Sequence, residues 1–199
     1  MNERTDQELT AAYARGDEHA FSILIERYLQ PIHRFLFRLV RDKELAEDLS
    51  QETFVRAWKK FVTFDQARSF KSWLFAIARY AAFDALKKKQ PLRFSEITRE
   101  GLPEEGLEAT LADERPSPQE ELISEEQRQG LEELLAELPL SAQEVILLHD
   151  DEDLTFQEIA DTLHEPLNTV KSRYRRGLLL LREKLIKTSK KPSLMSKNR

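Results

Sequence analysis

Cysteine is absent from this sequence of 199 residues, and glycine is scarce, with only 5 residues. Without thiols the chain has no disulfide, no thiolate zinc site and no cysteine nucleophile, which suits a reducing compartment. So few glycines provide no glycine-rich phosphate loop, and the 4 histidines are scattered without metal-ligand spacing. No nucleophile stands beside a base in a recognisable motif. We therefore expect no catalytic residue, no metal and no cofactor.

Long hydrophobic runs are missing as well. The longest ones, such as 178–181, are far shorter than a membrane span, and the polar N-terminus lacks the apolar core of a signal peptide. The sequence therefore predicts a soluble, cytoplasmic protein without membrane contact. With 40% hydrophobic and 34% charged residues, the chain can bury one or two small cores.

Charge is distributed unevenly along the chain, whose formal net charge is -5. Residues 91–137 contain 14 acids and 4 bases, whereas residues 171–199 contain 11 bases and one acid. The basic block is an electrostatic footprint for a polyanion. Within the acidic stretch, residues 99–121 are rich in glycine, proline and glutamate without a sustained period, which predicts a flexible linker. We expect one unit over 1–92, a linker over 93–124, a second unit over 125–187 and a basic disordered tail over 188–199.

Apolar residues recur at three and four positions in both units, and strand-like alternation is missing, so the predicted fold class is all-α. Capping-box patterns mark three helix starts, at Thr5, Ser141 and Thr155. The first unit is expected to have four helices, beginning near Asp6 and covering about 21–41, 43–61 and 69–89. In the second unit the expected helices are 126–138, 141–150, 156–163 and one that starts at 169.

The last two helices have the layout of a helix-turn-helix. The turn is 164–167, and Asn168 is expected to cap the second helix. The residues expected to face inward are Ile159, Ala160, Leu163, Val170 and Leu178. The start of the second helix then presents Lys171, Ser172, Arg173, Arg175 and Arg176 outward, where base edges and phosphates of a major groove would lie. A solvated basic helix is the alternative interpretation of these cations.

The stretch 64–90 interleaves aromatic and cationic residues, a composition suited to single-stranded nucleic acid. Most of its aromatics must still be core, and Trp73 follows the spacing of a buried stripe. The residues we expect to be exposed are Phe64, Lys71, Ser72, Phe75 and Arg79. Ahead of them, residues 43–61 leave a strip of Asp48, Gln51, Glu52 and Val55 on the outer face of a helix. Such a strip suits protein docking, although acids near a helix N-terminus also stabilise the helix dipole.

Five stretches together carry a resemblance to a known family: DLSQETFVRAW, FKSWLFAIARYAAFDALKK, an acidic linker, LPLSAQEVILLHDDEDLTFQEIADTL and NTVKSRYRRGLLLLREKL. In this order they resemble the extracytoplasmic-function sigma factors of bacterial RNA polymerase, over roughly residues 5–185. The resemblance implies a first unit (sigma region 2) that docks on the clamp helices of the largest polymerase subunit and melts the minus-ten element. It implies a second unit (sigma region 4) that reads the minus-thirty-five duplex, next to the polymerase beta flap. It also leaves room for an anti-sigma factor and places the protein at the nucleoid through polymerase.

The resemblance also implies roles for particular residues. Those matching the polymerase-docking helix are Asp48, Gln51, Glu52, Phe54, Val55 and Trp58. Those expected at the minus-ten element are Phe64, Lys71, Ser72, Phe75, Arg79, Tyr80, Lys87 and Lys88. Those expected at the minus-thirty-five element are Thr169, Lys171, Ser172, Arg173, Arg175 and Arg176. The chain departs from the family pattern at Tyr80, His164 and Asn168, so the promoter sequence does not follow from these positions.

Two other functions compete with this one. A stand-alone helix-turn-helix regulator would bind duplex DNA without polymerase, usually as a dimer, and would leave the strip at 48–58 unexplained. A helical adaptor that sequesters partners would not need the cations at Lys171, Arg173 and Arg176.

Overall fold

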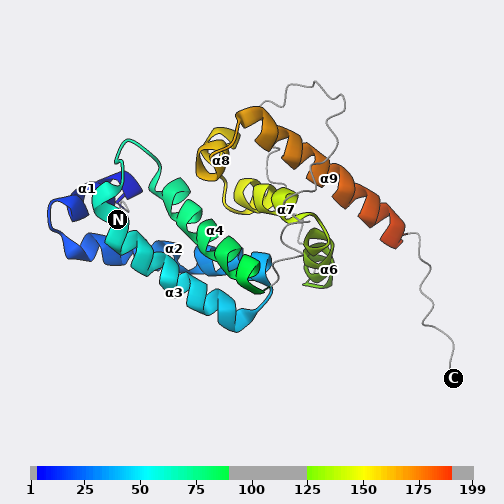
Figure 1. Ribbon diagram of the computed structural model, residues 1–199, viewed down its shortest axis with the longest axis horizontal. Helices are drawn as coiled ribbons and strands as arrows, with labels where there is room; N and C mark the ends of the chain where they lie inside the picture. Colours follow the sequence, from blue (N-terminus) through cyan, green and yellow to red (C-terminus); the bar gives the residue numbers. More distant parts are fainter. Residues whose placement is uncertain (1–3, 90–124, 190–199) are drawn as a thin grey trace.

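The computed structural model describes residues 4–89 and 125–189, which form two helical units (Figure 1). The first unit consists of α1 (Asp6–Ala14), α2 (Glu18–Val40), α3 (Lys43–Lys60), the 3₁₀ turn η1 (Phe61–Thr63) and α4 (Phe70–Lys89). The second unit consists of α6 (Glu125–Ala136), α7 (Leu140–Ile146), the π-helical turn η2 (Leu147–Asp151), α8 (Phe156–Leu163) and α9 (Leu167–Ser189). Neither described range contains a strand, and the all-α prediction is confirmed. The expected linker 93–124 and most of the expected tail lie outside the described residues.

The first unit is built around α2, which is 23 residues long and has Pro31 in its interior. Proline removes one helical hydrogen bond, yet α2 continues because its apolar face is buried on both sides of Pro31, for example at Leu24 and Ile32. An aromatic cluster closes the end of the unit. Phe61 packs edge-on against Tyr13 with ring centroids 4.6 Å apart, and Phe64 lies 4.8 Å from Trp73.

The second unit contains the predicted helix-turn-helix. Thr155 accepts a hydrogen bond from the Glu158 amide, and the Glu158 carboxylate accepts one from the Thr155 amide, so this capping box is confirmed. The one at Thr5 is confirmed in the same way. His164 ends α8 in the left-handed conformation, with φ at 54°, and donates its amide to the Ala160 carbonyl. This single residue turns the chain so that α9 packs across α8, burying Val170.

Two predicted helix starts are wrong because proline carbonyls begin these helices instead. The amides of Ala142 and Gln143 donate to Pro139, so α7 starts at Leu140, and Ser141 does not cap it. In the same way the amides of Thr169 and Val170 donate to the Pro166 carbonyl. Helix α9 therefore starts at Leu167, and Asn168 lies inside its first turn rather than at its cap.

Leu178 was also expected to face inward, but 39% of it is exposed. Gly177 occupies the inward position instead. A Cβ atom at Gly177 would lie 2.8 Å from Cδ1 of Ile146 and 3.3 Å from Cβ of Ala142. Helices α7 and α9 therefore approach closely at a residue without a side chain, and this contact turns the next residue, Leu178, toward solvent.

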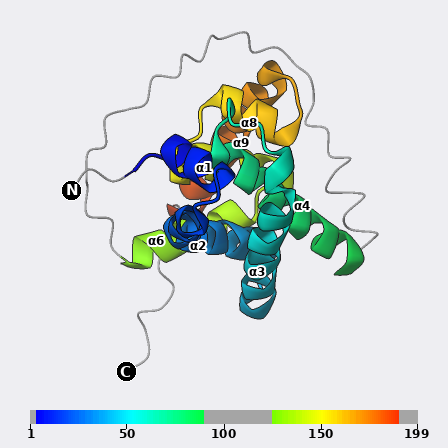
Figure 2. The same ribbon diagram turned by 90° about the vertical axis from the view of Figure 1, so that its left-hand side faces the viewer.

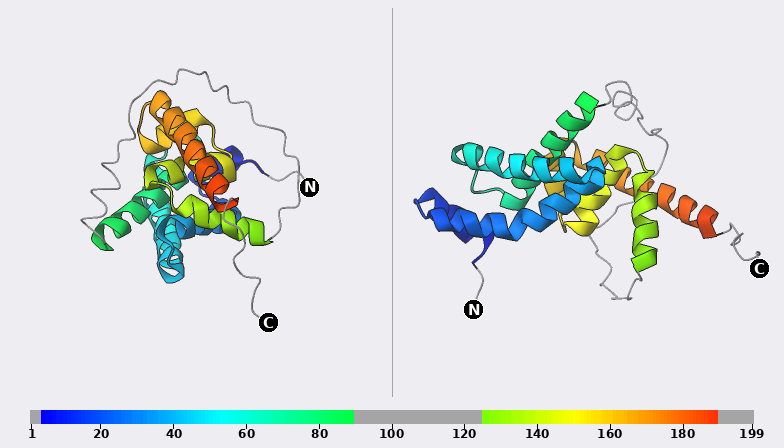
Figure 3. Two further views of the ribbon diagram at one scale, coloured as in Figure 1. Left: turned by 90° about the vertical axis from the view of Figure 1, so that its right-hand side faces the viewer. Right: turned by 90° about the horizontal axis from the view of Figure 1, so that it is seen from below.

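The two units pack against each other through α4 with α8 and through α2 with α6 and α7. Their buried apolar residues form one contiguous cluster. Figure 2 shows α8 beside the start of α4, and Figure 3 shows the C-terminal half of α9 projecting beyond the rest of the molecule. The contact between the units covers surfaces that the sequence predicted to be free.

Candidate nucleic-acid interface

The outer face of α3 is exposed as predicted. Asp42 caps this helix by accepting a hydrogen bond from the Leu45 amide at 3.1 Å. The turns that follow have an inner side, which faces the core, and an outer side, which faces solvent. The residues on the outer side are Asp48, Gln51, Glu52, Val55 and Trp58. Trp58 is 57% exposed, which is unusual for so large an apolar side chain.

Phe54 does not belong to that outer face. It is 8% exposed and lies in the apolar core of the first unit, together with Leu49 and Ala57. All three side chains lie on the buried side of α3. Phe54 therefore packs α3 against the core and is not available for direct docking.

Three residues expected at the nucleic-acid surface of α4 are buried instead. Phe75 is 0% exposed because its ring packs edge-on against Phe35 of α2, with centroids 5.2 Å apart. Phe64 is buried against Trp73, and Ser72 is buried where α8 contacts α4. The expectation that these three side chains are exposed is wrong, because the two phenylalanine rings pack into the apolar core and α8 covers Ser72. Three other residues that the family resemblance assigns to the minus-ten element are exposed, namely Tyr80, Lys87 and Lys88.

Arg79 of α4 forms a buried ion pair with the second unit. Its Nε atom lies 2.6 Å from an oxygen of Glu144 on α7, and only 1% of the Glu144 side chain is exposed. Burial raises the pKa of Glu144, while the Arg79 guanidinium opposes that rise. A second guanidinium, that of Arg173 on α9, lies 3.8 Å from the same carboxylate. Glu144 therefore stands between a cation of each unit.

Lys71 at the start of α4 is engaged in a similar way. Its ammonium group donates to the Glu152 backbone carbonyl and lies 3.7 Å from the Glu152 carboxylate. Arg34 of α2 approaches the same carboxylate at 3.4 Å. Burial raises the pKa of Glu152, and the charges of Lys71 and Arg34 oppose the rise. Two cations predicted to face nucleic acid, Lys71 and Arg79, thus face acids of the second unit.

The cationic start of α9 is partly exposed. Arg173 pairs with Glu165 of the turn at 2.8 Å, which holds its guanidinium beside the start of the helix. The Lys171 ammonium lies 5.7 Å from the centre of the Phe156 ring. Thr169, Ser172, Arg175 and Arg176 are partly exposed along the same helix turns. The structure thus brings the predicted duplex-reading residues together on one helix that a tight turn positions.

Comparison with known proteins decides the family. The model of Sigma-70 region 2 matches residues 24–91, and the model of Sigma-70 region 4 matches residues 128–181. The sequence is 30% identical over 172 residues to the ECF RNA polymerase sigma factor SigX of Bacillus subtilis, covering 83% of this chain and 84% of that one. It is 29% identical to SigW of the same organism, covering 86% and 91% of the two chains. The chain belongs to the ECF RNA polymerase sigma factors.

Solved structures agree with this sigma-factor assignment. The chain matches the sigma factor RpoE of Bartonella quintana, solved in complex with the anti-sigma factor NepR, with a TM-score of 0.61 and 25% identity over 83% of this chain and 96% of that one. The fold also matches CnrH, solved with the cytosolic domain of CnrY, with a TM-score of 0.64 and 22% identity over 90% and 96% of the two chains. The sigma factor supports transcription initiation, and the chemistry of RNA synthesis belongs to the polymerase.

Within this sigma factor, helices α3 and α4 fall in region 2, and the helix-turn-helix falls in region 4. Among residues 4–89 and 125–189, none of the helices is long and apolar enough to cross a membrane. In the same residues no three His, Asp or Glu side chains gather as they would around a metal ion. Sequence reasoning did not find Glu144 and Glu152 as partners of α4, since a capping-box pattern gave Glu144 a local role and Glu152 fell between two expected helices.

Proposed function

We propose that this sigma factor docks on core RNA polymerase through the outer face of α3, opens the minus-ten element with α4 and reads the minus-thirty-five duplex with α9. One observation carries the proposal: an exposed strip of acidic and apolar residues on α3 and a helix-turn-helix lie on separate units of one chain. A stand-alone repressor needs only the second of these surfaces. Membership of the sigma family supplies the reason for both.

The α3 strip has the composition of a protein-docking surface. Trp58 and Val55 offer exposed apolar area for anchoring, while Asp48, Gln51 and Glu52 surround them with polar and acidic groups that fix orientation. Glu52 is itself held by Arg56, whose Nε atom donates to it at 3.0 Å. The resemblance to the family points to the clamp helices of the largest subunit as the partner of this strip.

Helix α4 offers a stacking ring and a row of cations for the melted minus-ten strand. Tyr80 is 44% exposed, so a base can stack on it, and Lys87 and Lys88 extend the surface with charge for phosphates. Lys71 and Arg79 belong to the same face once they are released from their acids. Contacts to unstacked bases then offset the cost of strand opening, which is a few kcal/mol per flipped base.

Helix α9 is proposed to enter the major groove of the minus-thirty-five element with its first turns. In a helix-turn-helix these turns carry the residues that meet base edges. The residues in this position are Thr169, Lys171, Ser172, Arg173, Arg175 and Arg176. Arg173 is oriented by Glu165, so it is the best placed for a bidentate contact to a guanine. On the strength of the family resemblance, the polymerase beta flap is proposed to lie beside this unit.

Two further parts of the proposal follow from the family. A sigma factor acts where polymerase acts, which places this chain in the cytoplasm and at the nucleoid. An anti-sigma factor is also proposed as a partner, because the similar sigma factor RpoE was solved in complex with one.

Run-off transcription tests the function directly. Core RNA polymerase from the same bacterium is incubated with a library of genomic fragments, with and without this protein, and the transcript starts are sequenced. We expect starts that appear only with the protein and share two spaced upstream elements. Duplex binding without new starts would support the stand-alone regulator instead.

A further inference from the structure

Apolar side chains that face solvent form a line along the second half of α3. Within residues 4–89 and 125–189, the most exposed large apolar side chain is that of Val62, at 95%, in the turn η1 that follows α3. Val55 and Trp58 are about half exposed. Residues three and four positions apart are neighbours on a helix surface, so positions 55, 58 and 62 share one face. Neighbouring exposed apolar residues of this kind mark an interaction site.

The turn that carries Val62 is fixed by aromatic rings on its inner side. Phe61 and Phe64, which flank the turn position, are both buried. Their ring centroids lie 5.7 Å apart, and that of Phe61 lies 6.4 Å from Trp73. The Phe64 amide donates to the Phe61 carbonyl at 2.9 Å, which closes the turn. Val62 therefore cannot move inward without displacing a buried ring.

The geometry of the turn explains why position 62 faces outward, but it does not explain a valine there. Outward positions of tight turns are usually occupied by glycine, asparagine, aspartate or serine, which water solvates well. Val62 gains almost nothing from burial within this chain, so a partner that buries it would supply that free energy. A side chain that is already held in place also costs less entropy to bind.

We propose that Val62 is a further contact residue for core RNA polymerase, which receives it in an apolar site together with Val55 and Trp58. The proposal rests on the proposed docking function of α3. The strip then has two halves, an acidic one at Asp48 and Glu52 that fixes orientation and an apolar one that holds the complex together. The polymerase surface has to match this order, with cations opposite the first half and apolar side chains opposite the second.

Melted DNA is the competing partner for Val62, because Lys59 and Lys60 are exposed beside it. The position of Val62 favours polymerase. Lys89, which ends α4, pairs with Asp42 at the start of α3, with 2.7 Å between the ammonium nitrogen and a carboxylate oxygen. Helix α3 has 18 residues and is about 27 Å long. Val62 is thus about one helix length away from the exposed cations at the end of α4.

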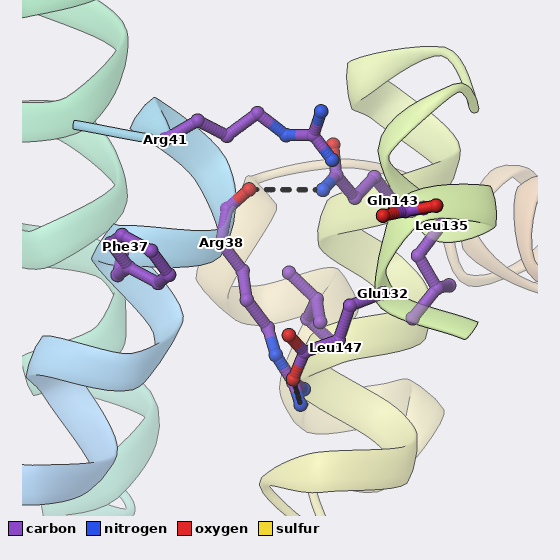
Figure 4. Close-up of a pocket in the computed structure, with 8 residues that line it drawn as sticks. Phe37, Arg38, Arg41, Glu132, Leu135, Gln143 and Leu147 are labelled. Carbon is purple, nitrogen blue, oxygen red and sulfur yellow. Dashed lines mark hydrogen bonds and ion pairs between the residues drawn. The ribbon is translucent and has the colours of Figure 1, made fainter. Parts of the chain in front are cut away.

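Exposed apolar residues of α2 provide the comparison. Phe37 lies on the wall of a cavity of about 280 Å³ that α2 shares with α6 and α7 (Figure 4), so its surroundings are not those of Val62. Leu29 is exposed on α2 to nearly the same extent as Val55 and lies outside the α3 strip. It is therefore the matched control for the loss of one exposed apolar side chain.

Fluorescence titration of the full-length protein with core RNA polymerase tests the proposal. Val62→Ser is expected to lower the affinity roughly fivefold, because serine gains nothing from an apolar site. Val62→Ile keeps an apolar, β-branched side chain and should bind within about twofold of the unmodified protein. Leu29→Ser should also stay within about twofold. Urea unfolding is expected to show unchanged stability for Val62→Ser, since the side chain is exposed.

Salt and rate measurements distinguish the two halves of the strip. The loss in Val62→Ser should appear as faster dissociation and should be the same at low and at high salt. Glu52→Gln should instead slow association, with an effect that disappears at high salt. A loss in Val62→Ser that disappears at high salt would contradict an apolar contact.

The outcome for Trp58→Ala separates this inference from the docking function on which it rests. If Trp58→Ala weakens polymerase binding and Val62→Ser does not, the role of Val62 is wrong and docking through α3 stands. If neither variant changes the affinity, docking through α3 is itself wrong. If Val62→Ser binds polymerase normally but directs fewer promoter-specific starts in run-off transcription, melted DNA covers Val62 and the proposal is overturned. An equal loss in Leu29→Ser would overturn it as well.

Discussion

The outer face of α3 and the side of α4 predicted to meet DNA belong to the same unit, and both were predicted as contact surfaces. They differ in how far the second unit covers them. On α3 the outer residues are exposed, with Trp58 and Val55 about half exposed. On α4 two of the cations, Lys71 and Arg79, are paired with carboxylates of the second unit, and the Ser72 carbonyl accepts a hydrogen bond from Thr162. The proposed docking surface is therefore exposed in the packed chain, whereas the proposed single-strand surface is exposed at Tyr80, Lys87 and Lys88 and covered at its start.

The two surfaces therefore differ in what a partner would meet. Under the proposed function, polymerase meets α3 residues that are already exposed, whereas a melted strand competes with Glu144 and Glu152 for Lys71 and Arg79. The net charge of -5 acts in the same direction, since it weakens binding of the free protein to DNA.

The largest effect is expected from Phe75, which distinguishes core from contact surface on α4. Phe75→Ala removes a fully buried ring that packs on Phe35, so we expect the free energy of unfolding to fall by about 3–5 kcal/mol. Tyr80→Ala is the matched control on the same helix, with an expected cost below about 1 kcal/mol because the ring is largely exposed. Urea unfolding measures both. If Phe75→Ala were as stable as the unmodified protein but no longer opened promoters, Phe75 would belong to the DNA-contacting surface.

The next largest effect is expected on the outer face of α3. Trp58→Ala removes the largest exposed apolar side chain of α3, and we expect the affinity for core polymerase to fall about 30-fold, equivalent to about 2 kcal/mol at a binding hot spot. Stability should be unchanged. Glu47→Ala, also exposed on α3, is expected to leave affinity within about twofold. Equal affinities of both variants for polymerase, measured by fluorescence titration, would remove the strip from the docking surface.

Two ion pairs allow the coupling energy of a buried contact between the units to be compared with that of an exposed contact on α3. Arg79 and Glu144 form a buried pair across the units, and a double-mutant cycle with Arg79→Gln and Glu144→Gln should give a coupling energy of about 1–2 kcal/mol in unfolding. The exposed pair Arg56 and Glu52 on α3 should give about 0.3–0.5 kcal/mol. Equal coupling energies for the two pairs would mean that burial between the units does not strengthen the ion pair of Arg79 and Glu144.

The sequence could predict what local pattern controls. Capping residues at Thr5 and Thr155, apolar spacing in α2 and the turn at His164 were each readable, because helix starts, buried faces and tight turns depend on residues close in the chain. The free strip of α3 followed from the same periodicity. Gly177 carried a weaker signal, since a glycine within a helix often marks a close approach that only the fold identifies.

The packing between the units could not be predicted, because it depends on residues 65 to 118 positions apart. Glu144 shows why. Its position three residues after Ser141 matched a capping box, and nothing in the local pattern opposed that interpretation. The structure uses the carboxylate for Arg79 instead, after Pro139 has started the helix. The buried aromatics of α4 were misassigned for the same reason, since periodicity does not say which of two neighbours covers a face.

The smallest expected effect concerns His164, where the helix-turn-helix meets Tyr80 of α4. His164 adopts a left-handed conformation, with φ at 54°, that glycine reaches without strain. His164→Gly should therefore be about 1 kcal/mol more stable than His164→Ala, because both lose the ring and only alanine keeps the strain. Thermal unfolding measures the difference. Equal stabilities of the two variants would show that the left-handed backbone at His164 carries no strain.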